Sequence, residues 1–236
     1  MKFHPYTNLA FASLLALACL LAIAPTLRSQ TSFNFNSDDG GFTVASGGPV
    51  ETVWTYGATA GVGGNGAWFV NGTSAQGTPS YSILTSPTLT VSTTGSAALS
   101  FDHRFSFEYD GTRWDGGQVQ LSLNGGAFTT VALAYTGTIT GNNILNGQQA
   151  FNGDSAGYGT PSYITSTATL GSFTAGDSIK IRFVGAWDEF SVGTAPNWVV
   201  DNVSVTNTAV SEPQAYAAVF GLATLGWAAH RRRRQA

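Results

Sequence analysis

The chain has 236 residues, of which 43% are hydrophobic and 10% charged, and its formal net charge at pH 7 is −3. Most of its basic residues lie near the two ends. Residues 31–210 contain four basic and twelve acidic side chains, a net charge of −8. A nucleic-acid-binding domain needs the opposite balance, so we expect no nucleic-acid partner. The single cysteine, Cys19, excludes disulfides and cysteine-based zinc sites from this central region.

The N-terminal residues 1–30 have the layout of a secretory signal peptide. A weakly basic start is followed by an apolar run at residues 9–24, which Pro25 ends. We therefore expect a helical signal peptide and export by the general secretory route. The run is short for a membrane anchor, which needs about 20 apolar residues, and such an anchor is the alternative. Two cleavage points compete, one after Ala24 and one before Cys19 as in a lipoprotein.

The central region, residues 31–209, predicts one all-β domain. Gly, Ser, Thr and Asn are abundant there, and apolar side chains alternate with polar ones, as in short strands joined by turns. The clearest strand spans residues 97–108. Its apolar face should carry Ala97, Leu99, Phe101, His103, Phe105 and Phe107. These features predict an antiparallel β-sandwich of the jelly-roll type.

Four more strands are expected in this region, at residues 118–123, 128–133, 179–183 and 199–205. The first of them should turn Val119, Leu121 and Leu123 toward the core. Between the first and the second, Asn124-Gly125-Gly126 provides the positive φ angles of a tight hairpin.

Six groups of short motifs follow one another in a recognisable order. They are FNFN at 33–36 with GGF at 40–42, YSILTSP at 81–87, LSFDHR at 99–104, WDGGQVQLS at 114–122, IKIRF at 179–183 and WVVDNVSV at 198–205. This order resembles that of the MAM and immune-inhibitor-A-like jelly-roll domains over most of residues 31–206. The resemblance implies a non-catalytic adhesion or accessory module, and calcium binding as in some members. The absence of cysteines from this region places the chain nearer the bacterial relatives.

Asp201 is the most informative acid for a metal site. It should share the inner face of the last expected strand with three valines, and a carboxylate on an apolar face needs a partner or a cation. Calcium prefers several oxygen ligands. We expect Asp115 as a second ligand, and Asp102 and Asn36 as further ones. Alternatively, Asp201 caps a loop or pairs with Arg182.

Catalytic residues are not expected. His103 is the one histidine of the central region, which argues against a histidine-rich zinc centre, and its inward position is typical of a packed core side chain. No Gly-x-Ser-x-Gly motif occurs. The remaining candidates are two pairs of neighbouring acids, which would serve sugar hydrolysis: Glu108 with Asp110, and Asp188 with Glu189.

Large aromatic side chains offer a second kind of binding surface. The candidates are Trp54, Tyr56, Trp68, Trp114, Trp187 and Trp198. Exposed on one side of the domain, two or three of these rings would stack against sugar rings. We expect most of them to fill the core instead.

Residues 210–236 form the third part of the chain. A polar triad is followed by an apolar stretch at residues 215–229 and then by arginines, an order that resembles the PEP-CTERM sorting signal. The predicted signal consists of Ser211, Glu212, Pro213, Arg231, Arg232, Arg233 and Arg234. Ser211 stands where that family has a proline. Fifteen apolar residues are short for a full membrane span, but flanking arginines extend the reach and should stay in the cytoplasm.

The sorting resemblance implies processing by an exosortase. The chain would be held transiently in the inner membrane by a C-terminal helix and then pass to the cell surface or the extracellular space. A plain C-terminal anchor is the alternative. Together these features predict a non-enzymatic structural or adhesive component of an exopolysaccharide or biofilm matrix. A carbohydrate-binding module and a glycoside hydrolase are the other two functions considered.

Overall fold

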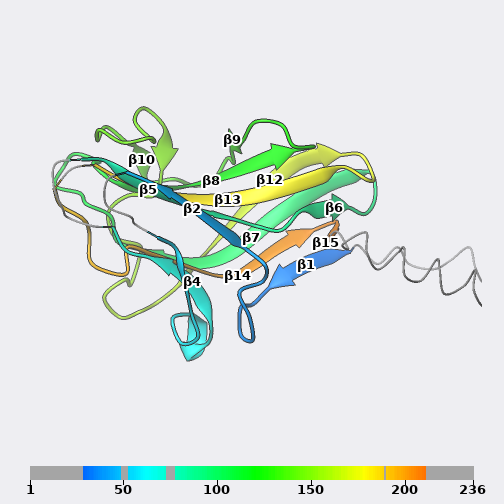
Figure 1. Ribbon diagram of the computed structural model, residues 1–236, viewed down its shortest axis with the longest axis horizontal. Helices are drawn as coiled ribbons and strands as arrows, with labels where there is room; N and C mark the ends of the chain where they lie inside the picture. The colour runs from blue at the N-terminus through cyan, green and yellow to red at the C-terminus, as the bar shows by residue number, and fades with distance from the viewer. Residues whose placement is uncertain (1–28, 49–52, 73–77, 189, 211–236) are drawn as a thin grey trace, which may run out of the picture.

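The computed structural model describes residues 29–48, 53–72, 78–188 and 190–210, and these residues form an antiparallel β-sandwich (Figure 1). The first sheet contains β1 (Gln30–Phe33), β3 (Thr55–Gly57), β4 (Ala67–Val70), β7 (Gly95–Phe105), β12 (Ile164–Phe173) and β14 (Trp198–Thr206). The second contains β2 (Thr43–Gly47), β5 (Ser80–Thr85), β6 (Leu89–Val91), β8 (Gly116–Leu123), β9 (Thr129–Thr130), β13 (Ser178–Trp187) and β15 (Thr208–Val210). The sandwich predicted from the sequence is confirmed.

Each sheet is built around its longest strands. In the first sheet the order is β12-β7-β14-β4-β3, and β1 also pairs with β14. In the second the order is β15-β6-β13-β5-β2, while β8 pairs with β13 and with β9. A small ribbon of β10 (Gly137–Thr138) and β11 (Gln149–Ala150) and a 3-10 turn, η2 (Val62–Gly64), complete the described elements. Among the described residues, no helix has the length and apolar character that a membrane crossing requires.

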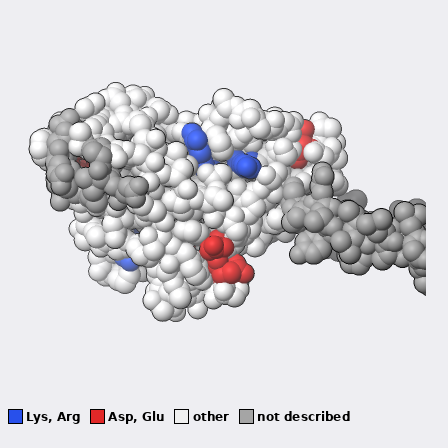
Figure 2. All heavy atoms as spheres, in the orientation of Figure 1, with Lys and Arg blue, Asp and Glu red and all other residues white. Residues whose placement is uncertain are grey.

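The predicted signal peptide helix and sorting tail lie outside the described residues. The two ends of the described chain lie side by side, because β1 pairs with the last part of β14 and the Ser29 hydroxyl donates to the main-chain oxygen of Thr208. Figure 1 shows β1 and β15 beside each other at one side of the sandwich. Charged side chains are sparse on the face shown in Figure 2, as the composition leads one to expect.

The core between the sheets is aromatic. Alternation along β7 places Ala97, Leu99, Phe101, His103 and Phe105 inward, as predicted, and all five are at most 2% exposed. Phe101 of the first sheet meets Phe183 of the second edge to face, with ring centroids 5.2 Å apart. Burying one such ring contributes roughly 1.5–3 kcal/mol, so this aromatic layer holds the two sheets together.

His103 belongs to that layer and is confirmed as a packed core histidine. Its Nδ1 accepts a hydrogen bond from the Trp198 indole N–H at 3.2 Å, and its Nε2 lies 2.8 Å from the Ser166 hydroxyl. Because an indole N–H can only donate, the ring proton of the neutral imidazole sits on Nε2. Burial lowers the pKa of His103 to about 3, so the side chain is neutral and closed to solvent at physiological pH.

The hairpin after β8 forms as predicted. Asn124 and Gly125 have positive φ angles of 50° and 73°, and the N–H of Gly126 donates to the carbonyl of Leu123 at 2.8 Å. The prediction that Leu123 points inward is wrong: the side chain is 42% exposed at the end of its strand. The return strand is also shorter than expected, since β9 contains two residues.

A bulge in β14 corrects the prediction for Asp201. Asn202 has φ 49°, and the register with β7 shifts between Asp201 and Ser204. The inserted residue lets Val203 and Val205 face the core, while Asp201 lies opposite Asp102 on the outer side of the sheet. The prediction that Asp201 shares a face with Val203 and Val205 is therefore wrong, whereas Val199, which pairs with Arg104 of β7, lies on the same outer side as Asp201.

Asp201 instead caps a loop, which was the alternative. Its carboxylate accepts hydrogen bonds from the N–H of Val62 at 2.8 Å and from the N–H of Asn202 at 2.6 Å. These bonds hold the turn η2 against the outer side of the first sheet.

Candidate functional site

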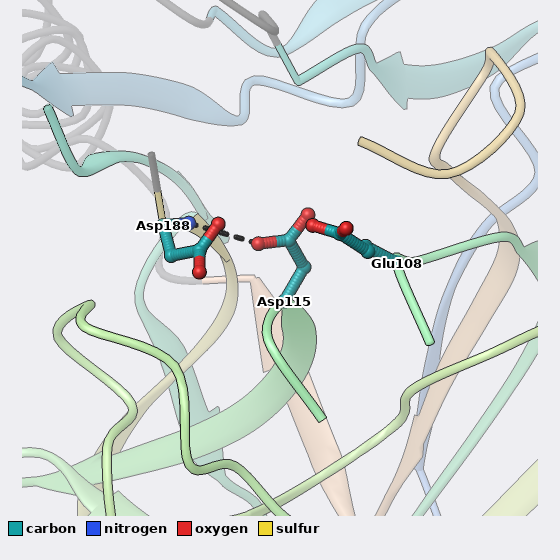
Figure 3. Close-up of side chains that lie close together, drawn as sticks. All are labelled: Glu108, Asp115 and Asp188. Atoms are coloured by element: carbon teal, nitrogen blue, oxygen red, sulfur yellow. Dashed lines mark hydrogen bonds between the residues drawn. The ribbon is translucent and has the colours of Figure 1, made fainter. Parts of the chain in front are cut away.

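Three acidic side chains meet at one end of the sandwich (Figure 3). Glu108 lies just after β7, Asp115 directly precedes β8, and Asp188 directly follows β13. One carboxylate oxygen from each residue lies within 4.8 Å of the other two. We call this set the acidic triad. It joins segments of both sheets at the end of the sandwich away from the chain ends.

Asp115 occupies the middle of the acidic triad. Its Oδ1 accepts a hydrogen bond from the main-chain N–H of Asp188 at 2.8 Å. Figure 3 shows its other oxygen turned toward the carboxylate of Glu108. The Asp115 side chain is 0% exposed, whereas Glu108 and Asp188 are half-buried. The triad thus has a closed floor and a more open rim.

Two glycines let the chain bring Asp115 into the interior. A Cβ atom on Gly117 would lie 2.7 Å from the ring of Trp198, and one on Gly116 would lie 2.6 Å from Ile139. A side chain at either position would clash with packed neighbours, on one face of β8 for Gly117 and on the other for Gly116, and would displace the start of the strand. The Asp-Gly-Gly sequence therefore sets the depth of the carboxylate.

Asn152 ties the first two segments of the triad together. Its side-chain amide donates to the main-chain oxygens of Glu108, at 2.9 Å, and of Asp115, at 2.7 Å. The side chain is buried, so no solvent replaces it. Two buried hydrogen bonds from one amide fix the separation of Glu108 and Asp115.

The charges around Asp115 are unfavourable to its ionised form. Burial raises the pKa of Asp115 to about 8, and repulsion from Asp188 and Glu108 adds to this, while main-chain N–H groups of both neighbours lower it in part. Burial, followed by repulsion from Asp188, also raises the pKa of Glu108. Oδ2 of Asp115 is buried and has no hydrogen-bond partner. Leaving a buried polar atom unpaired is costly, so this oxygen needs an explanation.

A pocket of about 390 Å³ opens above the acidic triad. It is lined by Glu108, Asp110, Trp114, Asp188 and Phe190. Asp110 orients the indole, because its Oδ1 accepts a hydrogen bond from the Trp114 ring N–H at 3.0 Å. Trp114 is partly exposed, and Phe190 is 69% exposed. The pocket therefore combines two accessible aromatic rings with three carboxylates.

The four predicted calcium ligands, Asp201, Asp115, Asp102 and Asn36, do not form one group. Asp115 joins Glu108 and Asp188, whereas Asp102 and Asp201 face each other on neighbouring strands. The Asp102 carboxylate accepts hydrogen bonds from the Thr165 hydroxyl and the Asn202 amide.

The fourth predicted ligand, Asn36, lies on an exposed loop after β1. Its main-chain N–H donates to the side chain of Asn34. Calcium at these positions stays a prediction.

Sequence reasoning found the members of the acidic triad but not their association. It paired Glu108 and Asp188 with acids adjacent in the chain, whereas the fold pairs them with Asp115. An available signal was position, since Glu108 ends the strand expected at residues 97–108, while Asp115 precedes the one expected at 118–123 and Asp188 follows the one expected at 179–183. The aromatic expectation is confirmed for most members: Trp54, Trp68, Trp187 and Trp198 are buried, and Tyr56 and Trp114 are partly exposed.

Comparison with known proteins gives likeness in structure alone. No family model matches the chain, and no curated protein sequence matches it. The CBM22-1 xylan-binding domain of a Paenibacillus barcinonensis protein is 10% identical over 80% of this chain and 100% of its own, with a TM-score of 0.42. The K1 cleaved adhesin domain of Lys-gingipain from Porphyromonas gingivalis is 15% identical over 75% and 97%, with a TM-score of 0.41.

A third solved structure, the C-terminal CBM6 of a marine laminarinase from Zobellia galactanivorans, is 12% identical over 75% of this chain and 99% of its own. Its TM-score is 0.38. Likenesses of this extent assign neither a ligand nor a function to the chain, which must be argued from its own residues.

Proposed function

We propose that this chain is an exported jelly-roll protein that binds carbohydrate, without catalysis, in the pocket above the acidic triad. The observation that carries the proposal is the lining of that pocket, where Trp114 and Phe190 stand beside the carboxylates of Glu108, Asp110 and Asp188. A sugar presents apolar C–H faces and many hydroxyl groups. Exposed aromatic rings can stack against the apolar C–H faces, and carboxylate oxygens can accept hydrogen bonds from the hydroxyl groups.

The volume and placement of the pocket support a binding role. About 390 Å³ falls within the range of small-ligand sites. Trp198 of β14 pairs with Phe105 at the pocket end of the sandwich, whereas Thr206, at the other end of the same strand, pairs with Gln30. Nine residues of strand separate the two ends by roughly 25 Å. The pocket would face away from any attachment at the chain ends.

Export and sorting complete the proposal and rest on the sequence. The apolar run at residues 9–24 supports a signal peptide, and residues 211–234 support recognition by an exosortase. Both segments lie outside the described residues. The protein would then act as an adhesive component that holds an exopolysaccharide at the cell surface or in the matrix. Mass spectrometry of the mature protein tests this part, since exosortase processing removes the arginine tail and a plain anchor keeps it.

A glycoside hydrolase is the second candidate, because Glu108 and Asp188 are two carboxylates in one pocket. Hydrolysis requires a carboxylic acid and a carboxylate on either side of the glycosidic bond. Here the space between Glu108 and Asp188 is occupied by Asp115, which is fully buried and beyond the reach of a sugar. This arrangement favours binding over cleavage.

The test is binding of the purified protein to a panel of bacterial and plant polysaccharides, followed by assay for released reducing ends. We expect retention on at least one polysaccharide and no release. Trp114→Ala and Phe190→Ala should each weaken that binding by about tenfold or more, which corresponds to roughly 1.4 kcal/mol. Phe190 is mostly exposed, so its replacement leaves folding intact.

The matched control is Phe128→Ala. Phe128 lines a different pocket, where its ring lies 4.0 Å from the guanidinium of Arg182. Its removal should leave polysaccharide binding unchanged. Binding that survives in both Trp114→Ala and Phe190→Ala, or is absent from the wild type, would contradict the proposal, and release of reducing ends would replace it with the hydrolase.

A further inference from the structure

We infer that the acidic triad of Glu108, Asp115 and Asp188 binds a divalent cation, and that calcium is the ion that fits it. The inference goes beyond carbohydrate binding and does not depend on it. Three observations carry the argument: the spacing of the oxygens, the unpaired oxygen of Asp115 and the acidic groups that act on Glu108 and Asp115.

The spacing fits a hard cation. Calcium binds oxygen ligands at about 2.3–2.6 Å, so two oxygens on the same ion are at most about 5 Å apart. One oxygen from each of Glu108, Asp115 and Asp188 lies within 4.8 Å of the others. Among the described His, Cys, Asp and Glu residues, this is the set of three that meets within such a distance. All three ligands are carboxylates, which suit calcium and magnesium better than zinc.

Oδ2 of Asp115 points to the ligand. This atom is fully buried, lacks a hydrogen-bond partner and is turned into the triad toward Glu108 (Figure 3). The other oxygen, Oδ1, is satisfied by the N–H of Asp188. A buried carboxylate that is held by one oxygen, with its second oxygen turned toward the carboxylate of Glu108, has the geometry of an incomplete coordination shell. A cation there would supply the missing partner of Oδ2.

The local charges need such a counter-ion. The charged groups that act on Glu108 and Asp115 are other acids: Asp188, Asp110 and each other. The nearest basic residue in sequence, Arg113, is directed elsewhere, since its guanidinium donates to the main-chain oxygen of Thr136 and lies over the ring of Tyr109. Neighbouring acids thus disfavour the charged forms of Glu108 and Asp115, and a divalent cation at the triad would reverse this effect.

A bound cation would also join three separate segments. Glu108 follows β7 of the first sheet, whereas Asp115 and Asp188 flank β8 and β13 of the second. An ion at their meeting point would link the two sheets at the end where the pocket opens. It should therefore stabilise the folded state by binding the native form alone.

The experiment is a calcium titration of the metal-free full chain, without carbohydrate, followed by calorimetry and thermal melting. Extracellular modules bind calcium with dissociation constants of about 10⁻⁴–10⁻³ M, and we expect a value of this order with a rise in melting temperature. Asp188→Asn and Glu108→Gln should each weaken calcium binding by about tenfold or more. The control, Asp154→Asn, removes an exposed acid from the same end of the domain and should leave the affinity unchanged.

Terbium provides a readout of position. This ion occupies calcium sites and emits when a nearby indole is excited, and Trp114 lines the same pocket as Glu108 and Asp188. Indole-sensitised emission should appear in the wild type, fall in Trp114→Phe and disappear when calcium displaces the terbium.

Two results would overturn the inference. One is no calcium binding by the wild type at millimolar concentration. The other is binding that survives in both Asp188→Asn and Glu108→Gln but disappears in Asp201→Asn, which would assign the ion elsewhere. Because no glycan is present, neither result bears on carbohydrate binding.

Discussion

Acid should remove the contribution that one buried side chain, His103, makes to the stability of the fold. The ordinary pKa of this histidine in an unfolded chain is 6.5, and burial in the aromatic core lowers it to about 3 in the folded state. Below pH 6.5 the unfolded chain therefore binds a proton that the folded chain excludes. The stabilising contribution is fully present above pH 6.5 and is lost as the pH falls toward 3. Each pH unit in this window costs about 1.4 kcal/mol, so acidification from pH 7 to 5 should remove about 2 kcal/mol of the contribution of His103, measured against a variant that does not titrate.

The assay is urea unfolding of wild type and His103→Gln at a series of pH values. Glutamine can accept from the Trp198 indole and donate to the Ser166 hydroxyl, but it does not titrate. The raised pKa values of Asp115 and Glu108 act in the opposite direction, since their protonation favours the folded state, and they are common to both proteins. The difference between the two stability curves thus isolates His103. Parallel curves from pH 7 to 5, or an imidazole resonance of His103 that titrates near pH 6.5, would refute the reasoning.

Two further predictions concern the residues that place the acidic triad. Gly117→Ala should destabilise the protein by about 1–3 kcal/mol, because the new methyl group would lie 2.7 Å from the Trp198 ring. The control is Gly159→Ala, where no atom lies within 4 Å of the new methyl group, and it should change stability by less than about 0.5 kcal/mol. Chemical denaturation of both variants measures the two effects. Asn152→Ala should cost about 2–3 kcal/mol, because it leaves the main-chain oxygens of Glu108 and Asp115 without their shared donor. A loss below about 0.5 kcal/mol in Asn152→Ala would show that the amide does not hold the two segments together.

The strands could be predicted where burial on one face imposes a strict alternation. In β7 every second residue from Ala97 to Phe105 is buried, and the pattern is legible because the strand is long and lies in the middle of its sheet. The hairpin at Asn124 and Gly125 was equally accessible, since few residues other than Asn and Gly adopt positive φ. Both signals are local, so one sequence suffices to find them.

The errors come from features that depend on contacts across the fold. The bulge at Asn202 reverses the face of Asp201, and no alternation rule anticipates a single inserted residue. Leu123 is exposed because it stands at the end of β8, where the hairpin begins. In each case the pairing of strands, rather than the local sequence, decides which way a side chain points.

The site was harder to predict for a related reason. Its three acids are separated by up to eighty residues, and the register of β8 and β13 brings them together: Ala186 pairs with Gly116, so that Asp115 and Asp188 emerge at the same end of the sheet. Glu108 arrives from the other sheet through the amide of Asn152. Each acid alone looks like a solvated residue at a strand end, and only the pairing turns them into a cluster.

Depth divides the roles of the side chains in this cluster. Asp115 is fully buried, so its free oxygen can meet an ion but not a sugar. Trp114 and Phe190 are accessible and can meet a sugar but not the ion at the floor. Glu108 and Asp188 are half-buried and border both. A cation that engages one oxygen of each would fix their orientation and leave the second oxygen directed at the pocket. Ion binding in the acidic triad would then support sugar binding in the pocket, because the ion would fix the positions of the carboxylates that accept hydrogen bonds from a sugar hydroxyl.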